Sequence, residues 1–194
     1  MLFKLPVSLF FLISLHLGSA QTDYGDKVAS AAVALTEDEV VYNGAYFSIS
    51  YPNGDVPQPY GVCTDVVIRT YRKLGVDLQK EVHEDMKAHF NDYPQLWGLK
   101  GTDTNIDHRR VPNLRTYFTR KGASITVTKN ESNYKPGDIV SWVLNSGLTH
   151  IGIVSNQKVP ATNRYYIVHN IGAGQVLEDC LFSFKITGHY SYEH

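Results

Sequence analysis

Apolar residues recur at helical spacing along the segment that begins at Cys63. They fall three or four positions apart as far as Leu74, as on one face of an α-helix, and Gly75 follows as a typical helix stop. The pattern therefore predicts an amphipathic helix whose first residue is Cys63. Other segments are also predicted to be helical: Asp26 to Leu35, Leu78 to Phe90, and Val111 to Lys121, the last entered through Pro112 and ended by Gly122.

Beyond Gly122, the spacing of apolar residues changes to an alternation of period two. Alternation over short segments, with turn residues between them, is typical of β-strands. The stretches from Tyr42 to Tyr60 and from Asn91 to Arg110 are predicted to be loops. Helices followed by strands predict an α+β fold, with N-terminal helices packed on a C-terminal antiparallel sheet, and residues 21–194 as a single domain. The expected strands are Ser124 to Thr128, Asp138 to Leu144, His150 to Ser155, Tyr165 to Asn170, and Phe182 to Tyr190.

The first 20 residues have the pattern of a signal peptide. Lys4 supplies a positive start, an apolar run extends from Leu9 to Leu17, and Gly18-Ser19-Ala20 offers a small-residue cleavage site. The run is shorter than the roughly 20 residues needed to cross a bilayer. We therefore expect a protein exported to the periplasm or beyond, without stable membrane insertion after cleavage. An uncleaved anchor is the open alternative.

Charge and composition narrow the class of partner. The formal net charge is −1 and no basic stripe is present, so the surface that nucleic-acid binding requires is not expected. The chain is long enough to bury a core without metal or disulfide staples, and we expect a monomer. Its 13 tyrosines either pack in the core or line a groove for sugar or peptide.

Cys63 is the candidate nucleophile, because unpaired N–H groups at the start of a helix favour a thiolate. The turn residues before it, Tyr60 among them, would leave N–H groups free for an oxyanion. Asp65, in the first turn, favours the helix terminus but opposes a thiolate, so a base is required. A disulfide between Cys63 and Cys180 is the open alternative in an exported protein. Cys180 itself is expected to be structural.

His150 is the candidate base, at the head of a predicted strand. Gly152 in the same strand would let another chain or a substrate come close. If this strand and the next form a hairpin, His169 lies directly opposite His150 and could orient its ring, whereas Asn170 points to the other face. The two histidines could equally be hydrogen-bonded structure. They could also bind zinc with a further ligand such as His108 or Asp65.

Several motifs resemble known families. The segments Lys135 to Trp142, His150 to Val154, and Val168-His169 look like the core of the NlpC-type cell-wall peptidases of the papain-like superfamily. The resemblance implies a papain-like half-barrel, with Cys63 as nucleophile, His150 as general base, His169 as orienting residue, and no metal or organic cofactor. In that family Asp usually precedes the cysteine and Ser-Gly follows it, where this chain has Val62 and Thr64-Asp65. A closer resemblance, over nearly the whole chain after residue 20, is to a bacterial family of unknown function numbered 1287, through Gly61 to Ile68, Asn105 to Leu114, and Gly188 to Tyr190.

The run from Asp107 to Arg110 has no counterpart in the NlpC core. Its members are Asp107, His108, Arg109 and Arg110. Arginine pairs bidentately with carboxylates, so this segment either binds a carboxylate-bearing substrate or forms a structural ion-pair knot.

These features together lead to a specific expectation for the activity. We expect hydrolysis of an amide bond in peptidoglycan stem peptide or another peptide, through a thioester at Cys63. The backbone N–H of Cys63, with a contribution from Tyr60, would stabilise the oxyanion. The alternative, from a different class of protein, is a non-catalytic module with the same fold that binds the cell wall.

Overall fold

The computed structural model describes residues 17–194 of the chain. Residues 1–16, most of the predicted signal peptide, lie outside the described part, and α1 (Leu17–Val33) begins at the first described residue. Within residues 17–194, no helix combines the length and the apolar character needed to cross a membrane.

The helices predicted to begin at Cys63, Leu78 and Val111 begin at those residues and end one or two residues before their predicted ends. The helix predicted from Asp26 to Leu35 is α1, which begins nine residues earlier. α1 continues into a 3-10 turn, and the helix that begins at Cys63 ends before Gly75, whose φ of +83° closes it. The side chain of Asp77 caps the next helix by accepting hydrogen bonds from the N–H groups of Gln79 and Lys80. The helical elements after α1 are η1 (Ala34–Glu37), α2 (Cys63–Lys73), α3 (Leu78–Ala88), η2 (Phe90–Asp92), η3 (Asp107–Arg109), α4 (Val111–Arg120) and η4 (Glu131–Asn133).

An antiparallel sheet follows the helices, so the α+β prediction is confirmed. In the described part of the chain, its five strands lie in the order β6-β5-β4-β3-β7. A separate two-residue parallel pair, β1 with β2, lies in the stretch predicted as loop, just before α2. The strands are β1 (Val41–Tyr42), β2 (Tyr60–Gly61), β3 (Ile139–Val143), β4 (Thr149–Lys158), β5 (Tyr165–His169), β6 (Val176–Glu178) and β7 (Lys185–Tyr190).

Two strand predictions were wrong. Residues 124–128 form no strand and make a single bridge, between Ser124 and Tyr190. Their apolar members Ile125 and Val127 are exposed, so the alternation there buries no face against the core. β6 was missed because it is only three residues long and follows a glycine-containing turn.

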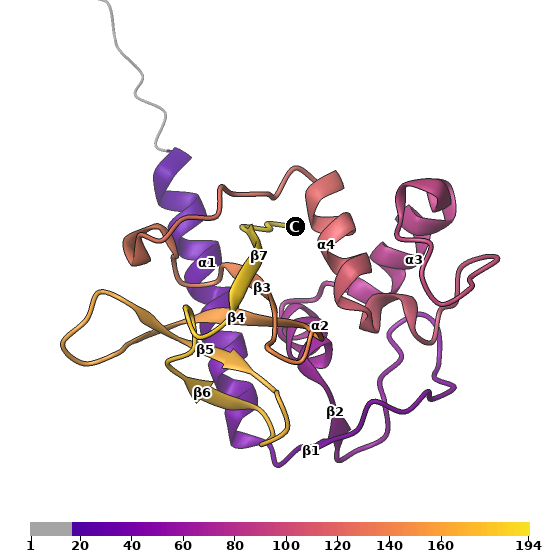
Figure 1. Ribbon diagram of the computed structural model, residues 1–194, viewed down its shortest axis with the longest axis horizontal. Helices are drawn as coiled ribbons and strands as arrows, with labels where there is room; N and C mark the ends of the chain where they lie inside the picture. The colour runs from indigo at the N-terminus through magenta and orange to yellow at the C-terminus, as the bar shows by residue number, and fades with distance from the viewer. Residues whose placement is uncertain (1–16) are drawn as a thin grey trace, which may run out of the picture.

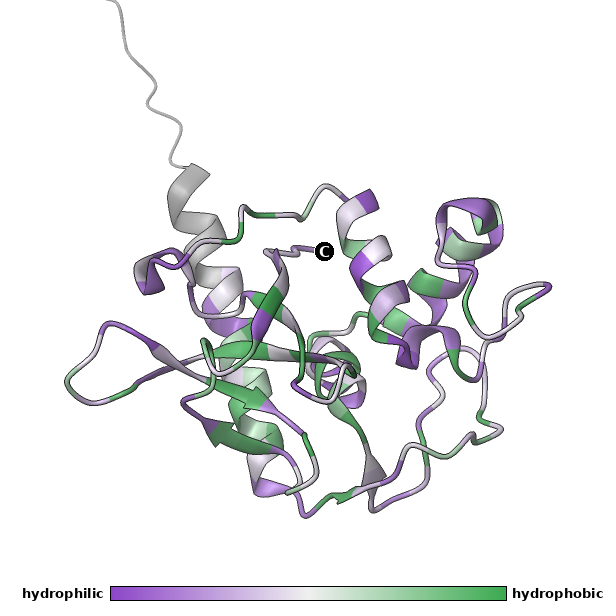
Figure 2. Ribbon diagram, viewed as in Figure 1, coloured by the Kyte–Doolittle hydropathy of each residue, from purple (hydrophilic) through white to green (hydrophobic). Residues whose placement is uncertain are grey.

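The sheet is apolar on both faces, which makes the molecule layered. α1 crosses behind the sheet, and α3 and α4 lie beyond α2 on the other side of the molecule (Figure 1). The helix-facing core contains Val67, Tyr71, Ile151 and Ile153 among others. The opposite face carries a second cluster of Val140, Trp142, Val154, Ile167, Cys180 and Leu181, closed by Tyr134. Hydropathy drawn on the ribbon shows the strands as the most continuous apolar segments (Figure 2).

The register between β4 and β5 differs from the predicted one by two residues. Ile153 pairs with Val168 and Val154 with Ile167, which places Gly152 rather than His150 beside His169. A shift of two residues keeps every side chain on its face. His150 and His169 are therefore diagonal neighbours on one face, where they were predicted to lie directly opposite each other.

Gly152 makes room for this arrangement. A Cβ added at Gly152 would lie 3.0 Å from Cβ of His169 and 2.9 Å from the carbonyl oxygen of Val168. The predicted close approach of another chain at Gly152 is thus confirmed, and the chain that approaches is β5.

Replacing Gly152 by Ala is expected to lower the free energy of unfolding by about 1–3 kcal/mol, because the added methyl group must push β5 away. Urea unfolding measures this loss. Gly44→Ala is the matched control, since a Cβ at Gly44 meets nothing within 4 Å, and its effect is expected within about 0.5 kcal/mol. Equal stability of the two variants would contradict this account of the β4–β5 contact.

Candidate functional site

The sulfur of Cys63 lies at the start of α2 against β4. The backbone N–H groups of Cys63, Thr64 and Ile151 hydrogen-bond to it and favour the thiolate, but burial outweighs them and raises the pKa of the thiol to about 12. Cys63 is 6% exposed. Both Cys63 and Cys180 are free thiols, so the structure does not contain the disulfide considered as an alternative.

Two buried imidazoles and a carboxylate form a chain of hydrogen bonds on the face of the sheet away from the helices. Nε2 of His150 lies 2.9 Å from Nδ1 of His169. Nε2 of His169 in turn lies 2.9 Å from Oε2 of Glu178. The side chain of His169 is fully buried and that of Glu178 is 56% exposed. The structure thus brings the two predicted histidines together and adds a carboxylate that the sequence analysis missed.

The order of these hydrogen bonds determines which nitrogen carries each proton. An ionised carboxylate can only accept, so Nε2 of His169 is protonated and donates to Glu178. In a neutral ring, Nδ1 of His169 is then an acceptor, and His150 donates to it from Nε2. Nδ1 of His150 is left without a proton, in the form that can accept one from a thiol.

Burial keeps both rings neutral, as this order requires. It lowers the pKa of His150 to about 3, and the neighbouring His169 adds to the effect. Burial also lowers the pKa of His169, while Glu178 opposes this change. At neutral pH, the rings therefore carry one proton each.

The thiol is linked to β4 through the residue next to His150, and the His150 ring has other neighbours. Sγ of Cys63 accepts from the N–H of Ile151, the residue that follows His150 in β4. Cys63 packs in the helix-facing core with Ile151 and Ile153. The ring of His150 instead lies against Trp142, with 5.7 Å between ring centroids. Among residues 17–194, no hydrogen bond joins Sγ of Cys63 to either imidazole.

Cys180 lies at the other end of this chain of hydrogen bonds. Its Sγ is 3.6 Å from Nε2 of His169. Together with Glu178, these residues form the group of potential metal ligands found in the described part of the chain. Glu178 and Cys180 are two positions apart, the spacing that puts strand residues on one face, and this was the signal available in the sequence.

The tyrosines of β1 and β2 differ in their relation to the thiol. The ring of Tyr60 stacks on Phe47 at 5.8 Å, and its carbonyl oxygen accepts from Arg69. Tyr42, which the sequence analysis did not single out, is electrostatically coupled to the site. Burial raises the pKa of Tyr42, and interactions with Cys63 and Asp65 add to this, while Arg109 opposes it. Tyr42 is therefore a neighbour of the thiol in β1.

Asp65 and Arg109 form a buried ion pair beneath the start of α2. Nε of Arg109 lies 2.9 Å from Oδ1 of Asp65, and its Nη2 lies 3.0 Å from Oδ2. Their side chains are only 3% and 2% exposed, for Asp65 and Arg109 respectively. Oδ2 of Asp65 also accepts from the N–H of Val62, and Thr64 donates to the carbonyl of Arg109. The charge of Asp65 thus anchors the helix start, and it also raises the pKa of Cys63.

The other members of the Asp107–Arg110 run are held by contacts within the protein. Oδ1 of Asp107 lies 3.6 Å from Nη1 of Arg110, whose guanidinium lies 4.1 Å from the centroid of the Trp97 ring. Burial raises the pKa of Asp107 to about 6 and lowers that of His108 to about 3. These contacts describe a structural knot, and binding of a substrate carboxylate by this run stays a prediction. Neither His108 nor Asp65 belongs to the group of potential metal ligands around His169.

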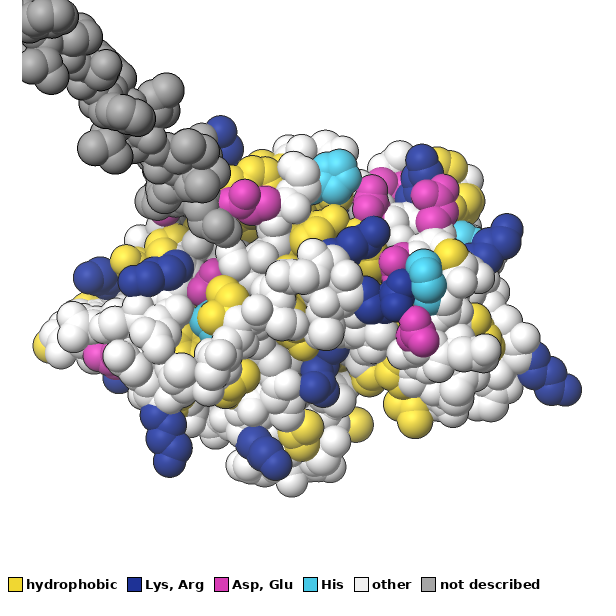
Figure 3. Space-filling model, turned by 90° about the horizontal axis from the view of Figure 1, so that it is seen from above, with side chains coloured by type: hydrophobic (Ala, Val, Ile, Leu, Met, Phe, Trp, Pro, Cys, Tyr) yellow, Lys and Arg dark blue, Asp and Glu magenta, His cyan; other side chains and the backbone are white. Residues whose placement is uncertain are grey.

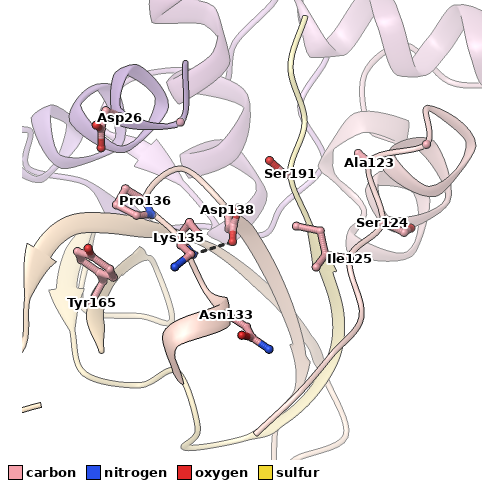
Figure 4. A pocket seen from close by; sticks show the side chains of 12 residues that line it. Asp26, Ala123, Ser124, Ile125, Asn133, Lys135, Pro136, Asp138, Tyr165 and Ser191 are labelled. Carbon is pink, nitrogen blue, oxygen red and sulfur yellow. Dashed lines mark hydrogen bonds between the residues drawn. The ribbon is translucent and has the colours of Figure 1, made fainter. Parts of the chain in front are cut away.

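A cavity of about 720 Å³ lies elsewhere, and its lining includes Asp26, Lys135, Asp138 and Tyr165 (Figure 4). At its wall, Oδ2 of Asp138 lies 2.7 Å from Nε2 of His189. This contact joins two of the motifs that carry the family resemblance. The cavity does not contain Cys63, His150 or His169, so we place the candidate chemistry at the thiol and not in this hollow.

Charged side chains are interspersed on the face seen from above (Figure 3). In the described part of the chain, Arg120 pairs with Asp85 at 2.7 Å and with Asp92 at 2.6 Å. Side chains of one sign do not gather into a continuous patch on this face.

Comparison with known proteins identifies the family. Residues 29–192 match the model of a domain of unknown function, DUF1287. The chain belongs to this family. It is 51% identical over 165 residues to the uncharacterized protein YijF of Escherichia coli (strain K12), an alignment that covers 85% of this chain and 80% of YijF. No solved structure matches the chain.

Replacing Asp65 by Asn is expected to lower the free energy of unfolding by about 3–5 kcal/mol, because Arg109 would stay buried without a counter-charge. The amide can still accept the N–H of Val62, so the helix cap is retained. Urea unfolding provides the measurement. The double variant Asp65→Asn, Arg109→Met is expected to recover part of the loss. A cost below about 1 kcal/mol for Asp65→Asn would show that the pair does not hold the helix start.

Replacing His108 by Gln is expected to flatten the acid dependence of stability. The folded chain leaves His108 neutral, whereas the unfolded chain protonates it below its usual pKa of about 6.5, so stability falls as pH drops from there towards 3. Arg109 and Arg72 add to the lowered pKa of His108, while Asp55 and Asp103 oppose it. Below about pH 6, the slope of the free energy of unfolding against pH should decrease by about 1.4 kcal/mol per pH unit in His108→Gln. Urea unfolding at a series of pH values tests this, and the exposed His89→Gln is the control; an unchanged slope in His108→Gln would refute it.

Proposed function

We propose that this chain is an exported cysteine hydrolase of papain-like, NlpC-type architecture, which cleaves an amide bond in peptidoglycan stem peptides. The observation that carries the proposal is the hydrogen-bonded chain Glu178–His169–His150, which leaves Nδ1 of His150 free to take a proton. The sulfur of Cys63 contacts the same strand, where it accepts from the N–H of Ile151. A base oriented by a second polar group is the arrangement that thiol hydrolases use.

The reaction follows from the groups present. The proton of Cys63 passes to Nδ1 of His150 as the sulfur attacks the carbonyl carbon, and the resulting oxyanion accepts from backbone N–H groups at the start of α2. Each such donor contributes on the order of 3 kcal/mol in known cases. The protonated His150 then gives its proton to the leaving amine. Water hydrolyses the thioester, which releases the carboxylic acid and restores the thiol.

The raised pKa of Cys63 means that the thiol loses its proton only when a substrate is bound. The pKa of the Cys63 thiol is about 12 and that of His150 is about 3, so a stable thiolate–imidazolium pair does not form in the resting site. Proton transfer must therefore accompany attack on the bound carbonyl. His169 holds the ring of His150 in place, and Glu178 stabilises the charge that develops on the rings.

The assignment of the substrate rests on less direct support. The predicted signal peptide would deliver the chain to the compartment of the cell wall, and the motifs around Asp138, His150 and His169 resemble those of NlpC-type peptidases. Peptidoglycan stem peptide is the amide-bearing polymer of that compartment. The proposed steps use only the side chains and backbone N–H groups named above.

A non-catalytic binding module is the second candidate. Its support is the burial of Cys63 and the absence of a hydrogen bond between Sγ and either imidazole among the described residues. In that case, the histidine pair and its carboxylate would be structural, and the protein would bind cell wall without cleaving it.

Digestion of purified peptidoglycan, followed by mass spectrometry of the released fragments, tests the proposal. The full-length protein is expected to release new peptide fragments. Cys63→Ala and His150→Gln are expected to release them at least about 100-fold more slowly, because each removes a partner in proton transfer. His89→Gln, which changes an exposed histidine far from the thiol, serves as the matched control and should retain activity.

The outcomes separate the candidates. Fragments that appear equally with Cys63→Ala would rule out hydrolysis by this thiol. Sedimentation of the protein with peptidoglycan, without any fragments, would favour the binding module.

A further inference from the structure

The end of the hydrogen-bonded chain at Glu178 has, together with Cys180, the composition of a metal site. Nε2 of His169, a carboxylate oxygen of Glu178 and Sγ of Cys180 all lie within 4.8 Å of one another. They come from the end of β5, the end of β6 and the turn that follows it. Pairing of Ile167 with Glu178 puts the carboxylate on the face that also carries His169.

The spacing of these atoms is close to that of a tetrahedral zinc centre. Zinc–sulfur and zinc–nitrogen bonds of about 2.3 and 2.0–2.1 Å, at a tetrahedral angle, place sulfur and nitrogen about 3.6 Å apart. Sγ of Cys180 and Nε2 of His169 are separated by 3.6 Å. The carboxylate oxygen, now 2.9 Å from Nε2, would move outward by about 0.5 Å to its own position. Glu178 is the exposed member, so this movement requires no repacking of the core.

The surroundings favour a soft cation held by three protein ligands. Cys180 is 3% exposed and packs in the apolar cluster with Trp142 and Leu181. A thiolate and an imidazole select zinc over magnesium or calcium, which prefer oxygen ligands. The exposed carboxylate provides the path of entry, and water would complete the coordination as the fourth ligand.

We propose that His169, Glu178 and Cys180 form a zinc site whose occupation disables His150 as a base. The metal-binding part stands on the ligand geometry alone. The inhibitory part rests on the proposed function, because it concerns the same histidine pair.

The effect on His150 follows from counting protons. Zinc takes the lone pair of Nε2 of His169 in place of the proton there, and the neutral ring then carries its proton on Nδ1. Nδ1 of His169 becomes a donor, so Nε2 of His150 becomes its acceptor and the proton of His150 resides on Nδ1. The proton lost from Nε2 of His169 is balanced by the one gained on Nδ1 of His150, and the thiol proton of Cys180 goes to solvent. Nδ1 of His150 can then no longer accept a proton from Cys63.

Titration of the metal-free, full-length protein with Zn²⁺ and with Co²⁺ tests the site. One ion per chain is expected, and the Co²⁺ form should show a thiolate-to-cobalt charge-transfer band in the near ultraviolet. Cys180→Ser is expected to lose this band, and its zinc affinity should fall at least about 100-fold. Changes to the partners of metal ligands cost up to about that much. Glu178→Gln, which alters an exposed side chain, should weaken zinc binding at least about tenfold with the fold intact.

Cys63→Ser is the matched control, because it removes the other buried thiol and should keep both stoichiometry and spectrum. Circular dichroism establishes that each variant is folded. Zinc binding of unchanged affinity in Cys180→Ser and Glu178→Gln, or the absence of stoichiometric binding by the unaltered protein, would overturn the site.

Activity on peptidoglycan separates this inference from the proposed function. Zinc is expected to lower the rate of the unaltered protein at least about tenfold, and to have little effect on Cys180→Ser, each relative to its own zinc-free rate. Stoichiometric zinc binding without hydrolysis would leave the metal site standing and remove the proposed function. Cys63-dependent hydrolysis that saturating zinc does not slow would remove the inhibitory role.

Discussion

The need to satisfy two imidazoles buried inside the sheet determines most of the site. The strands are apolar on both faces, and His150 and His169 lie on the face covered by Trp142, Leu181 and Cys180. A charged ring would be costly there, and a neutral ring still needs partners for its nitrogens. The rings therefore bond to each other, and His169 also bonds to the exposed Glu178. Orientation and proton position at His150 follow from this single constraint.

A different kind of constraint holds the thiol. The start of α2 is tied to the segment before α4 by the Asp65–Arg109 pair and by the hydrogen bond from Thr64 to the Arg109 carbonyl. Buried ion pairs contribute little net stability compared with apolar packing, but losing one partner is costly. In this chain the pair ties the position of Cys63 to an element more than 40 residues further along the sequence. The carboxylate of Asp65 also raises the pKa of Cys63 and so works against the thiolate.

Nε2 of His169 has two possible partners, and this gives the site two chemical states. When Nε2 donates to Glu178, Nδ1 of His150 carries a lone pair. When Nε2 instead bonds to a metal shared with Cys180, the proton of each ring moves to its Nδ1. The proposed catalysis is supported in the first state and opposed in the second.

Local pattern determined the helices, the antiparallel sheet and the placement of Cys63 at a helix start, because helical periodicity, alternation and glycine stops act over a few residues. It also placed His150 and His169 on one face, and this survived a register error of two residues because side chains in a strand alternate with a period of two. The tertiary structure alone decided the true register, the pairing of Asp65 with Arg109, and the arrival of Glu178 and Cys180 at His169. Each of these features depends on which distant segments meet and on how deeply they are buried. The residues next to each position in the sequence do not determine either.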